Sequence, residues 1–345
     1  MHSTDESLPM VSVIVPVKNG SAKIRDLLGS LERLDYPQNK LEVLIVDGNS
    51  TDGTREVVSE YHVKLLTEER PGINAARNTG LKYSTGEIVA FTDADCVVSE
   101  DWVRKIVEDF QDQTVACVAG NVEGYYHDFL SKYSDESILP VLRRFSKREV
   151  LDRIKPPLQY PAGCNMAVRR AVIERVGLFD ESIAFGFDED ELVERICKNG
   201  NRMVLDPAVL IRHKHRSSLA ELLKQNFRYG RGMGLLPRVR GFSSTFSKWI
   251  LLLVCVSVVW AGVILFSAVM TVLTSSVAFL ATLLTSLLFP LVGLIVYYAY
   301  RSIKLGDKGL LKIVTYPFID FGRSLVFLVG GVYQLLKPGK KPTPQ

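Results

Sequence analysis

The sequence predicts an α/β fold, with a mostly parallel sheet flanked by helices, followed by an α-helical membrane region. Through residues 1–240, short apolar runs of strand type alternate with segments of helical period, which is typical of a parallel sheet covered on both faces. The stretch Trp249–Tyr300 then contains no charged side chain and is long enough to cross a ~30 Å hydrocarbon core twice. We therefore expect a folded domain at 1–240 and a membrane domain at 241–345.

The elements of the first domain follow from local pattern, because β-branched apolar runs predict strands and apolar spacings of three and four predict helices. The predicted strands are Val11–Val17, Leu41–Val46, Glu87–Thr92, Val115–Val122, Met166–Val168 and Ala208–Arg212. The predicted helices are Ile24–Leu34, Thr54–Tyr61, Ile73–Tyr83, Asp101–Phe110, Arg170–Val176, Glu191–Lys198 and Leu219–Tyr229. Strand and helix alternate along the chain, which favours parallel pairing.

Composition narrows the partners and the compartment. The net charge of +4 is mild and no basic patch is interleaved with aromatic residues, so we expect no nucleic-acid partner. The five cysteines have no CxxC or metal-like spacing, which indicates a reducing compartment rather than a disulfide framework or a zinc site. The residues before the first strand are polar and unlike a signal peptide, so we expect the first domain in the cytoplasm.

Polar side chains follow the predicted strands at the point where each strand ends. They are Asn19, Asp47 and the pair Asp93 and Asp95, and the carboxyl ends of such strands form the ligand-binding edge of the sheet. Two carboxylates one residue apart suit a divalent cation, and Mg²⁺ often shares phosphate oxygens, so a nucleotide diphosphate is the expected partner. Asp47 can accept a hydrogen bond from a base or ribose, whereas we interpret Asp52 as a helix cap.

Two further segments carry charges whose roles stay open. Arg77, on the helix before the third predicted strand, either faces phosphates or is a plain surface arginine. Four consecutive acids, at 188–191, begin a helix, where they complement its macrodipole. Adjacent carboxylates also repel one another, which raises pKa values and allows one of them to act as a general base on an acceptor hydroxyl.

Histidine and amide groups complete the candidate set. His213 follows a predicted strand and can complete a metal shell, with His215 as the less favoured alternative. Gln225 and Arg228 lie three residues apart, on one helix face, beside Tyr229. They either hold an acceptor sugar and a diphosphate or form a solvated helix face.

The chain as a whole resembles the family 2 glycosyltransferases of the GT-A fold, from Val11 to about Arg231. The matching stretches are VSVIVPVKNG, EVLIVDGNSTDGT, GINAARNTGLKYSTGEIVAFTDADC, GCNMAVRRAVIERVGLFDE, FDEDELVERICKNG and QNFRYGRG. The resemblance implies a nucleotide-binding sheet, a UDP- or GDP-linked sugar donor, a Mg²⁺ or Mn²⁺ ion and inversion at the anomeric carbon. Separately, the charged and irregular pattern of Tyr125–Pro157 leads us to expect a mobile insertion lining the acceptor side.

Carried over residue by residue, the resemblance assigns the donor site first. Asp47 would contact the nucleotide base, Asp93 and Asp95 the ribose and the metal-bound diphosphate, and His213 the metal. The remaining donor-binding candidates are Pro16, Asn19 and Arg77. The family often has Asp-Asp-Gly-Ser after the second strand, whereas this chain has Asp-Gly-Asn-Ser at 47–50, so the second acid is missing.

Two alignments of the acidic segment with the family give two different candidates for the catalytic base. Counting back from Leu192 gives Glu189, whereas matching the family's Glu-Asp pair gives Asp190. We favour Asp190 because Asp is the family's usual base, and keep Asp188 as a further candidate. The segment with Gln225, Arg228 and Tyr229 is similar to the family's QxxRW signature, with Tyr in place of Trp, and implies an acceptor or diphosphate site.

The membrane domain is expected to contain two spans, at about 249–270 and 276–300, with the turn at Thr271–Ser276. Basic residues after the second span predict a cytoplasmic loop, on the same side as the first domain; they are Arg301, Lys304, Lys308 and Lys312. The apolar stretch 313–336 is either a third span or an interfacial helix, in which we expect Asp320 and Arg323 to pair at i, i+3.

These features predict an inverting glycosyltransferase anchored in the cell membrane by several spans. Its partners would be membrane lipids and a lipid-linked or glycan acceptor. The alternatives are an inactive sugar-nucleotide-binding scaffold and a processive polysaccharide synthase, which would need a homo-oligomer to enclose a channel. A dinucleotide oxidoreductase is disfavoured because VPVKNG stands where GxGxxG would follow the first strand.

Overall fold

The computed structural model describes residues 7–138, 144–156, 159–183, 186–241, 244–306 and 309–337. Two compact units make up the chain. The first contains the described residues up to Glu136 and from Arg144 to Ser217, and the second contains Ser137, Ile138 and the residues from Ser218 onward. The second unit begins ahead of the boundary expected from composition near residue 240, because the helix that starts at Leu219 packs against the apolar helices.

A nine-stranded sheet forms the centre of the first unit, in the order β3-β2-β1-β4-β8-β6-β9-β5, with β7 beside β9. The strands are β1 (Val11–Val17), β2 (Leu41–Asp47), β3 (Lys64–Thr67), β4 (Ile88–Phe91), β5 (Cys96–Val98), β6 (Val115–Gly124), β7 (Glu149–Leu151), β8 (Met166–Arg169) and β9 (Arg202–His213). The strands β3, β5 and β7 were not predicted; β5 and β7 have three residues each, which are too few to show a pattern.

The direction of the strands changes across the sheet. β3, β2, β1 and β4 pair in parallel, as the alternation of strand and helix predicts. β8 is antiparallel to β4 and β6, and β5 and β7 are antiparallel to β9, so the sheet is mixed beyond β4. The predicted α/β class is therefore confirmed, with parallel pairing confined to the first four strands and to β6 with β9.

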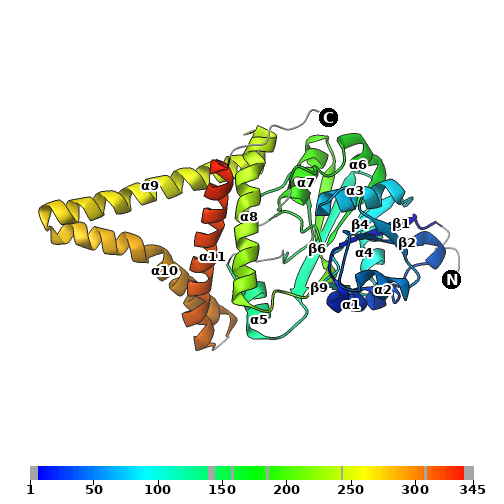
Figure 1. Cartoon of the computed structure of the whole chain (residues 1–345), viewed down its shortest axis with the longest axis horizontal. Coiled ribbons are helices and arrows are strands. Elements are labelled where there is room, and N and C mark those ends of the chain that lie inside the picture. Colours follow the sequence, from blue (N-terminus) through cyan, green and yellow to red (C-terminus); the bar gives the residue numbers. More distant parts are fainter. Residues whose placement is uncertain are drawn as a thin grey trace. The chain divides into compact units, whose positions relative to one another are not determined.

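Helices cover both faces of this sheet, with α3, α6 and α7 on one face and α1 and α4 on the other (Figure 1). The helices of the first unit are α1 (Ser21–Leu31), η1 (a 3-10 turn, Gln38–Lys40), α2 (Thr54–Ser59), α3 (Ile73–Tyr83), α4 (Trp102–Asp109), α5 (Phe129–Glu136), α6 (Arg170–Val176) and α7 (Asp188–Lys198). Helix α5 and strand β7 lie in the stretch expected to be an irregular insertion, part of which (139–143 and 157) is outside the described residues.

The second unit consists of α8 (Leu219–Arg240), α9 (Thr245–Thr274), α10 (Val277–Leu305) and α11 (Leu310–Leu336). Helices α9, α10 and α11 are each long and apolar enough to cross a membrane. The break between α9 and α10 falls in the predicted turn, at Ser275, which adopts a left-handed conformation (φ 51°). The stretch left open in the sequence thus forms a third helix of spanning length.

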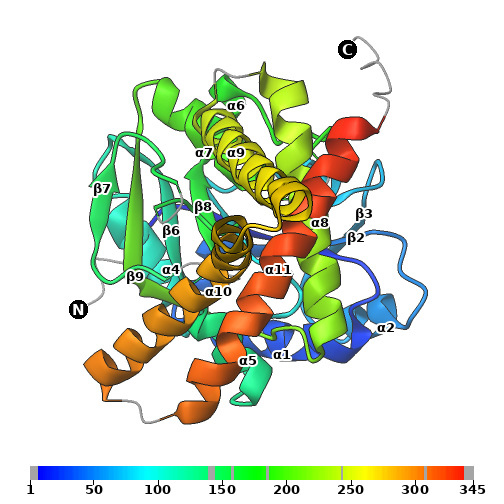
Figure 2. The same ribbon diagram turned by 90° about the vertical axis from the view of Figure 1, so that its left-hand side faces the viewer.

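Helices α8 and α11 lie side by side, as Figure 2 shows. Glycine makes this approach close, since a Cβ on Gly230 would overlap the carbonyl oxygen of Phe327, and a Cβ on Gly330 would overlap that of Phe227. Close helix packing through small residues is common between membrane helices. Helix α8 continues to Arg240, well beyond the predicted end at Tyr229.

One polar cluster is buried among the apolar helices. Arg323 Nη1 lies 3.6 Å from Asp320 Oδ1, which confirms the predicted i, i+3 pair. Ser137 Oγ donates a hydrogen bond to the same Asp320 oxygen (2.6 Å) and accepts one from Arg323 (3.1 Å). The Tyr298 hydroxyl donates to the other oxygen of Asp320, and the backbone N–H of Ile138 donates to Tyr298 (2.9 Å). Together these contacts neutralise and saturate a carboxylate inside an apolar unit.

Candidate active site

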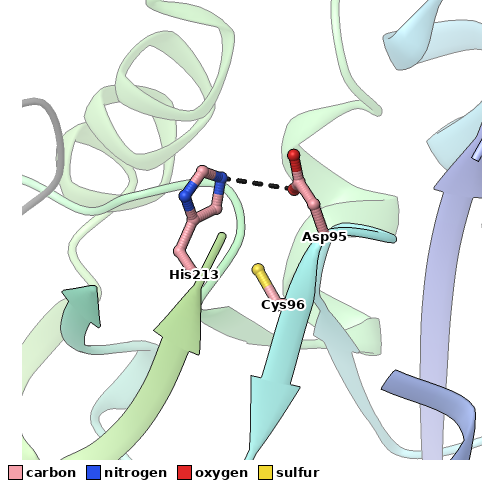
Figure 3. A group of neighbouring side chains, drawn as sticks. All are labelled: Asp95, Cys96 and His213. Atoms are coloured by element: carbon pink, nitrogen blue, oxygen red, sulfur yellow. Dashed lines mark ion pairs between the residues drawn. The ribbon is translucent and has the colours of Figure 1, made fainter. Parts of the chain in front are cut away.

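The turn between β4 and β5 carries Asp93 and Asp95, and the end of β9 carries His213. Strand β5 runs antiparallel to β9 with Cys96 opposite His213, so the sheet itself brings these distant segments together. His213 Nε2 lies 3.2 Å from Asp95 Oδ1 (Figure 3). The structure therefore unites the Asp-x-Asp pair with the histidine that the sequence singled out.

Asp95 is surrounded by cationic groups. Lys23 Nζ and Arg216 Nη1 each lie 3.5 Å from Asp95 Oδ2, while His213 contacts the other oxygen. Burial alone would raise the pKa of Asp95, but these neighbours outweigh it and hold the pKa below its ordinary value. Burial alone would lower the pKa of His213, whereas the Asp95 carboxylate outweighs that effect and raises it to about 9.

Sequence reasoning missed Lys23 and Arg216. Lys23 lies in the first turn of α1, directly after the turn that ends β1, and Arg216 lies three residues beyond His213. Both signals were available, because each residue follows a strand that ends at the binding edge of the sheet. Two partly exposed cations beside a carboxylate of the Asp-x-Asp turn can contact a diphosphate.

The donor atoms at this turn fit a divalent cation. Ligand atoms of Asp95, Cys96 and His213 all lie within 4.8 Å of one another. Asp93 Oδ1 is buried and has no hydrogen bond among the described residues, and Arg77 Nη2 lies 3.7 Å from it. Carboxylate oxygens and an imidazole nitrogen suit Mg²⁺ or Mn²⁺, whereas the thiol of Cys96 is soft and belongs to the hydrophobic core. The residues that fit the ion are thus Asp93, Asp95 and His213.

Arg77 connects this turn to the acidic helix α7. Its side chain is buried on α3, pairs with the Asp188 carboxylate and lies near Asp93. Its guanidinium also stacks over the ring of Phe179, 5.2 Å from the ring centroid. Arg77 is therefore a buried bridge and not a surface arginine, and it makes the Asp-x-Asp turn and the start of α7 parts of one site.

The four acids that begin α7 have different surroundings. Asp188 pairs with Arg77, and Glu191 pairs with Arg195 at 2.8 Å. Asp190 is only 2% exposed, whereas Glu189 is partly exposed. Loss of solvation and the neighbouring Asp188 raise the pKa of Glu189 to about 8, against the opposing effect of Arg77. A Cβ on Gly163 would lie 2.9 Å from Arg77 Nη2, so the glycine leaves room for the guanidinium beside these acids.

The residues predicted to contact the nucleotide shape two adjoining turns. Asp47 is fully buried, pairs with Arg55 at 3.1 Å and accepts from the backbone N–H of Ser50. Asn19 has a left-handed backbone (φ 52°) and accepts from the N–H of Thr51, at 2.9 Å. Pro16 precedes this turn within β1. Their contact with a nucleotide stays a prediction.

Asp52 has the structural role expected of it. Its carboxylate accepts hydrogen bonds from the backbone N–H groups of Ser21 and Thr54, the first residues of α1 and α2.

The predicted acceptor residues lie on α8, in the second unit. The Gln225 side-chain amide donates to the Tyr229 hydroxyl, at 3.1 Å, and Arg228 lies on the same helix. Their role toward an acceptor stays a prediction. All five cysteines are free, and four of them are buried, as expected for single cysteines in packed positions.

Comparison with known proteins gives consistent matches. The family model described as Glycosyl transferase family 2 matches residues 12–177. Glycosyltransferase AglE of Haloferax volcanii is 33% identical over 235 residues, which cover 66% of this chain and 73% of that protein. Pre-mycofactocin glycosyltransferase of Mycobacterium tuberculosis is 31% identical over 231 residues, which cover 64% of this chain and 46% of that protein.

A solved structure supports the same fold. A mannosyltransferase from Pyrobaculum calidifontis, in complex with GDP-Man and Mn²⁺, matches with a TM-score of 0.59 at 23% identity. The match covers 95% of this chain and 87% of that chain. At this identity the likeness shows the fold, which is GT-A.

Proposed function

Because the chain belongs to glycosyltransferase family 2, we propose that it is a membrane-anchored inverting enzyme with a divalent ion in its donor site. The donor is a sugar linked to uridine or guanosine diphosphate, and the acceptor is lipid-linked or a glycan at the membrane face. The observation that carries this proposal is the bridge made by Arg77, which joins the carboxylates of the Asp-x-Asp turn to those of α7. Donor-side and acceptor-side chemistry thus share one site.

The donor side supplies charge to the leaving group. Lys23 and Arg216 flank Asp95 and contact the diphosphate as negative charge develops on it. An ion held by Asp93, Asp95 and His213 neutralises that charge when bound. The mannosyltransferase that shares the fold binds GDP-Man and Mn²⁺, which supports a donor and an ion of these classes.

The base is Glu189 in this proposal, with Asp190 as the alternative. Asp188 is paired with Arg77 and Asp190 is almost fully buried, whereas Glu189 is partly exposed and has a raised pKa. A base works best when its pKa lies near the operating pH. Glu189 accepts the proton of the acceptor hydroxyl as that oxygen attacks the anomeric carbon. The bond from this carbon to the diphosphate breaks on the opposite face, so the configuration inverts and nucleoside diphosphate leaves.

The three apolar helices support an acceptor at the membrane. Basic residues flank the connection from α10 to α11, with Arg301 and Lys304 near the end of α10 and Lys312 in the first turn of α11. They favour a cytoplasmic loop and a cytoplasmic catalytic unit in the cell membrane. In α11 the charges of Asp320 and Arg323 are buried and paired, as is usual for charged residues of a spanning helix. Transfer to a lipid-linked acceptor requires no sugar channel, unlike the processive synthase alternative.

The test uses the full chain in nanodiscs. Thermal unfolding with Mn²⁺ and a panel of UDP- and GDP-linked sugars should identify the donor by stabilisation, and release of nucleoside diphosphate should follow. Asp95→Ala should abolish both effects. Glu189→Gln should retain donor stabilisation and slow transfer by roughly 10²–10⁴-fold, with Asp190→Asn as the matched control.

Each outcome separates the readings. Loss of transfer in Asp190→Asn with activity in Glu189→Gln would move the base to Asp190. Stabilisation by a donor without any turnover would favour the inactive sugar-nucleotide-binding scaffold. A labelled product that partitions into organic solvent supports a lipid acceptor, and one that stays aqueous points to a soluble glycan.

A further inference from the structure

Behind His213 lies a chain of polar contacts that the proposed reaction does not use. His213 Nδ1 lies 3.3 Å from His215 Nδ1, and His215 Nε2 lies 3.0 Å from Asp135 Oδ1. The side chain of His215 is 1% exposed. His213 is the last residue of β9, and His215 lies two residues beyond the end of the strand. We call these three residues the His213–His215–Asp135 chain.

The partners of each ring decide where its protons lie. Asp135 can only accept, so His215 donates to it from Nε2 and has a free electron pair on Nδ1. That electron pair in turn requires His213 to donate from Nδ1. A neutral His213 then has its own electron pair on Nε2, the nitrogen 3.2 Å from Asp95. The His213–His215–Asp135 chain therefore leaves the electron pair that can bind a metal on His213 Nε2, on the side of the ring that faces Asp95.

The far end of the chain is itself held in place. Asp135 accepts from the backbone N–H of Gly124, at 3.0 and 3.1 Å, and pairs with Arg144 at 3.2 Å. Gly124 ends β6 directly opposite His213 in the sheet. A Cβ there would lie 3.0 Å from Asp135 and 3.1 Å from the His215 ring, so the glycine permits the contact. Three partners, the N–H of Gly124, Arg144 and His215, thus fix one carboxylate behind the metal-side histidine.

We propose that His215 and Asp135 are positioning residues for the metal site, holding the His213 imidazole in the tautomer and orientation that bind a divalent cation. This inference rests on the proposed function, because it assumes an ion at Asp93, Asp95 and His213. Neither His215 nor Asp135 ligates the ion, since both nitrogens of His215 are directed to His213 and Asp135. Hydrogen-bond partners of this kind typically change metal affinity by about 10–100-fold.

The experiment measures Mn²⁺ binding to the full-length protein in nanodiscs, by electron paramagnetic resonance of free Mn²⁺, alone and with GDP or UDP. His215→Ala should weaken binding by about 10–100-fold, and Asp135→Asn by less. In a His213→Ala background, His215→Ala should have no further effect, because it acts only through His213. The exposed His62 provides the matched control, His62→Ala, which should bind like the unchanged protein.

Pulsed measurements of the bound ion supply a second readout. The coupling from a ligating imidazole nitrogen should disappear in His213→Ala and weaken or shift in His215→Ala. Binding within threefold of the unchanged protein for both His215→Ala and Asp135→Asn would overturn the inference while the metal site stands. An equal loss in both backgrounds would also overturn it, since His215 would then act on the fold. Binding that survives Asp95→Ala and His213→Ala would refute the metal site itself, and the inference with it.

Discussion

Each unit of the protein buries an arginine against an aspartate, and the two pairs differ in what surrounds them. Arg77 and Asp188 are 3% and 4% exposed in the first unit, and Arg323 and Asp320 are 3% and 0% exposed in the second. Around Arg77 stand three carboxylates, of Asp188, Asp93 and Glu189. Around Arg323 stands Asp320 with the hydroxyls of Ser137 and Tyr298. The first cluster has surplus negative charge, and the second is balanced.

This difference teaches that a buried ion pair by itself says little about function. A balanced pair whose hydrogen bonds are satisfied is a structural element, often replaceable by apolar side chains. Surplus carboxylates in a poorly solvated place instead raise pKa values and leave oxygen atoms such as Asp93 Oδ1 without a hydrogen bond from any described residue. A bound cation can neutralise such carboxylates, and one of them can bind a proton. The proposed reaction uses both a cation and a proton acceptor.

The largest effect is expected at Arg77. Arg77→Met leaves three carboxylates without their common cation, which should lower the free energy of unfolding by about 3–5 kcal/mol and abolish nucleoside diphosphate release. Replacing Asp188 as well, in Arg77→Met/Asp188→Leu, should recover part of the stability but none of the activity. Thermal unfolding and turnover per folded molecule measure both. A double variant that regained activity would show that the pair at Arg77 is as structural as the one at Arg323.

The pair in the second unit should behave differently. Arg323→Met leaves Asp320 buried without its cation and should cost about 3–5 kcal/mol of stability, as at Arg77. Asp320→Leu/Arg323→Met removes both charges and should recover most of that loss. Turnover per folded molecule should stay unchanged in both variants, measured in nanodiscs beside the Arg77 series. A drop in turnover of the folded double variant would give this balanced pair a catalytic role and end the distinction.

Much of the fold was predictable because its signals are local. The strand β1, the helix α3 and the three apolar helices follow from periodicity and length, and the polar ends of β1, β2 and β4 from turn chemistry. The Asp320 and Arg323 pair also followed from i, i+3 spacing. The antiparallel pairing of β8 with β4 and β6 was not predicted. It depends on contacts between distant segments, which no local pattern encodes.

The site shows the same limit. The sequence identified Asp93, Asp95 and His213 separately, but only the pairing of β5 with β9 places the last two together. Arg77 was left open between a phosphate contact and a surface arginine, because burial cannot be read from one helix position. The choice between Glu189 and Asp190 depends on which carboxylate faces solvent, and register alone left it open.

The surplus negative charge around Arg77 also predicts how transfer and stability depend on pH, and this is the smallest of the expected effects. Glu189 must lose its proton to act as a base, so transfer should rise with pH up to about 8 and fall about tenfold per pH unit below it. The effect on stability has the opposite sign, because a raised pKa means that the folded state binds the proton more tightly than the unfolded chain. That contribution is full below pH 4.5, the ordinary value for Glu, and is lost as the pH rises through about 8.

Comparing the unchanged protein with Glu189→Gln isolates this carboxyl from the other titrating groups. The glutamine carries no charge at any pH, so its unfolding temperature should fall less steeply between pH 5 and 8, and at pH 8 the variant should be the more stable protein. Transfer rates and unfolding temperatures over this range give both slopes from the same samples. Parallel unfolding curves for the two proteins would mean that Glu189 titrates normally. The surplus of carboxylates around Arg77 would then be neutralised in some other way, and the contrast with Arg323 would have to rest on the metal side alone.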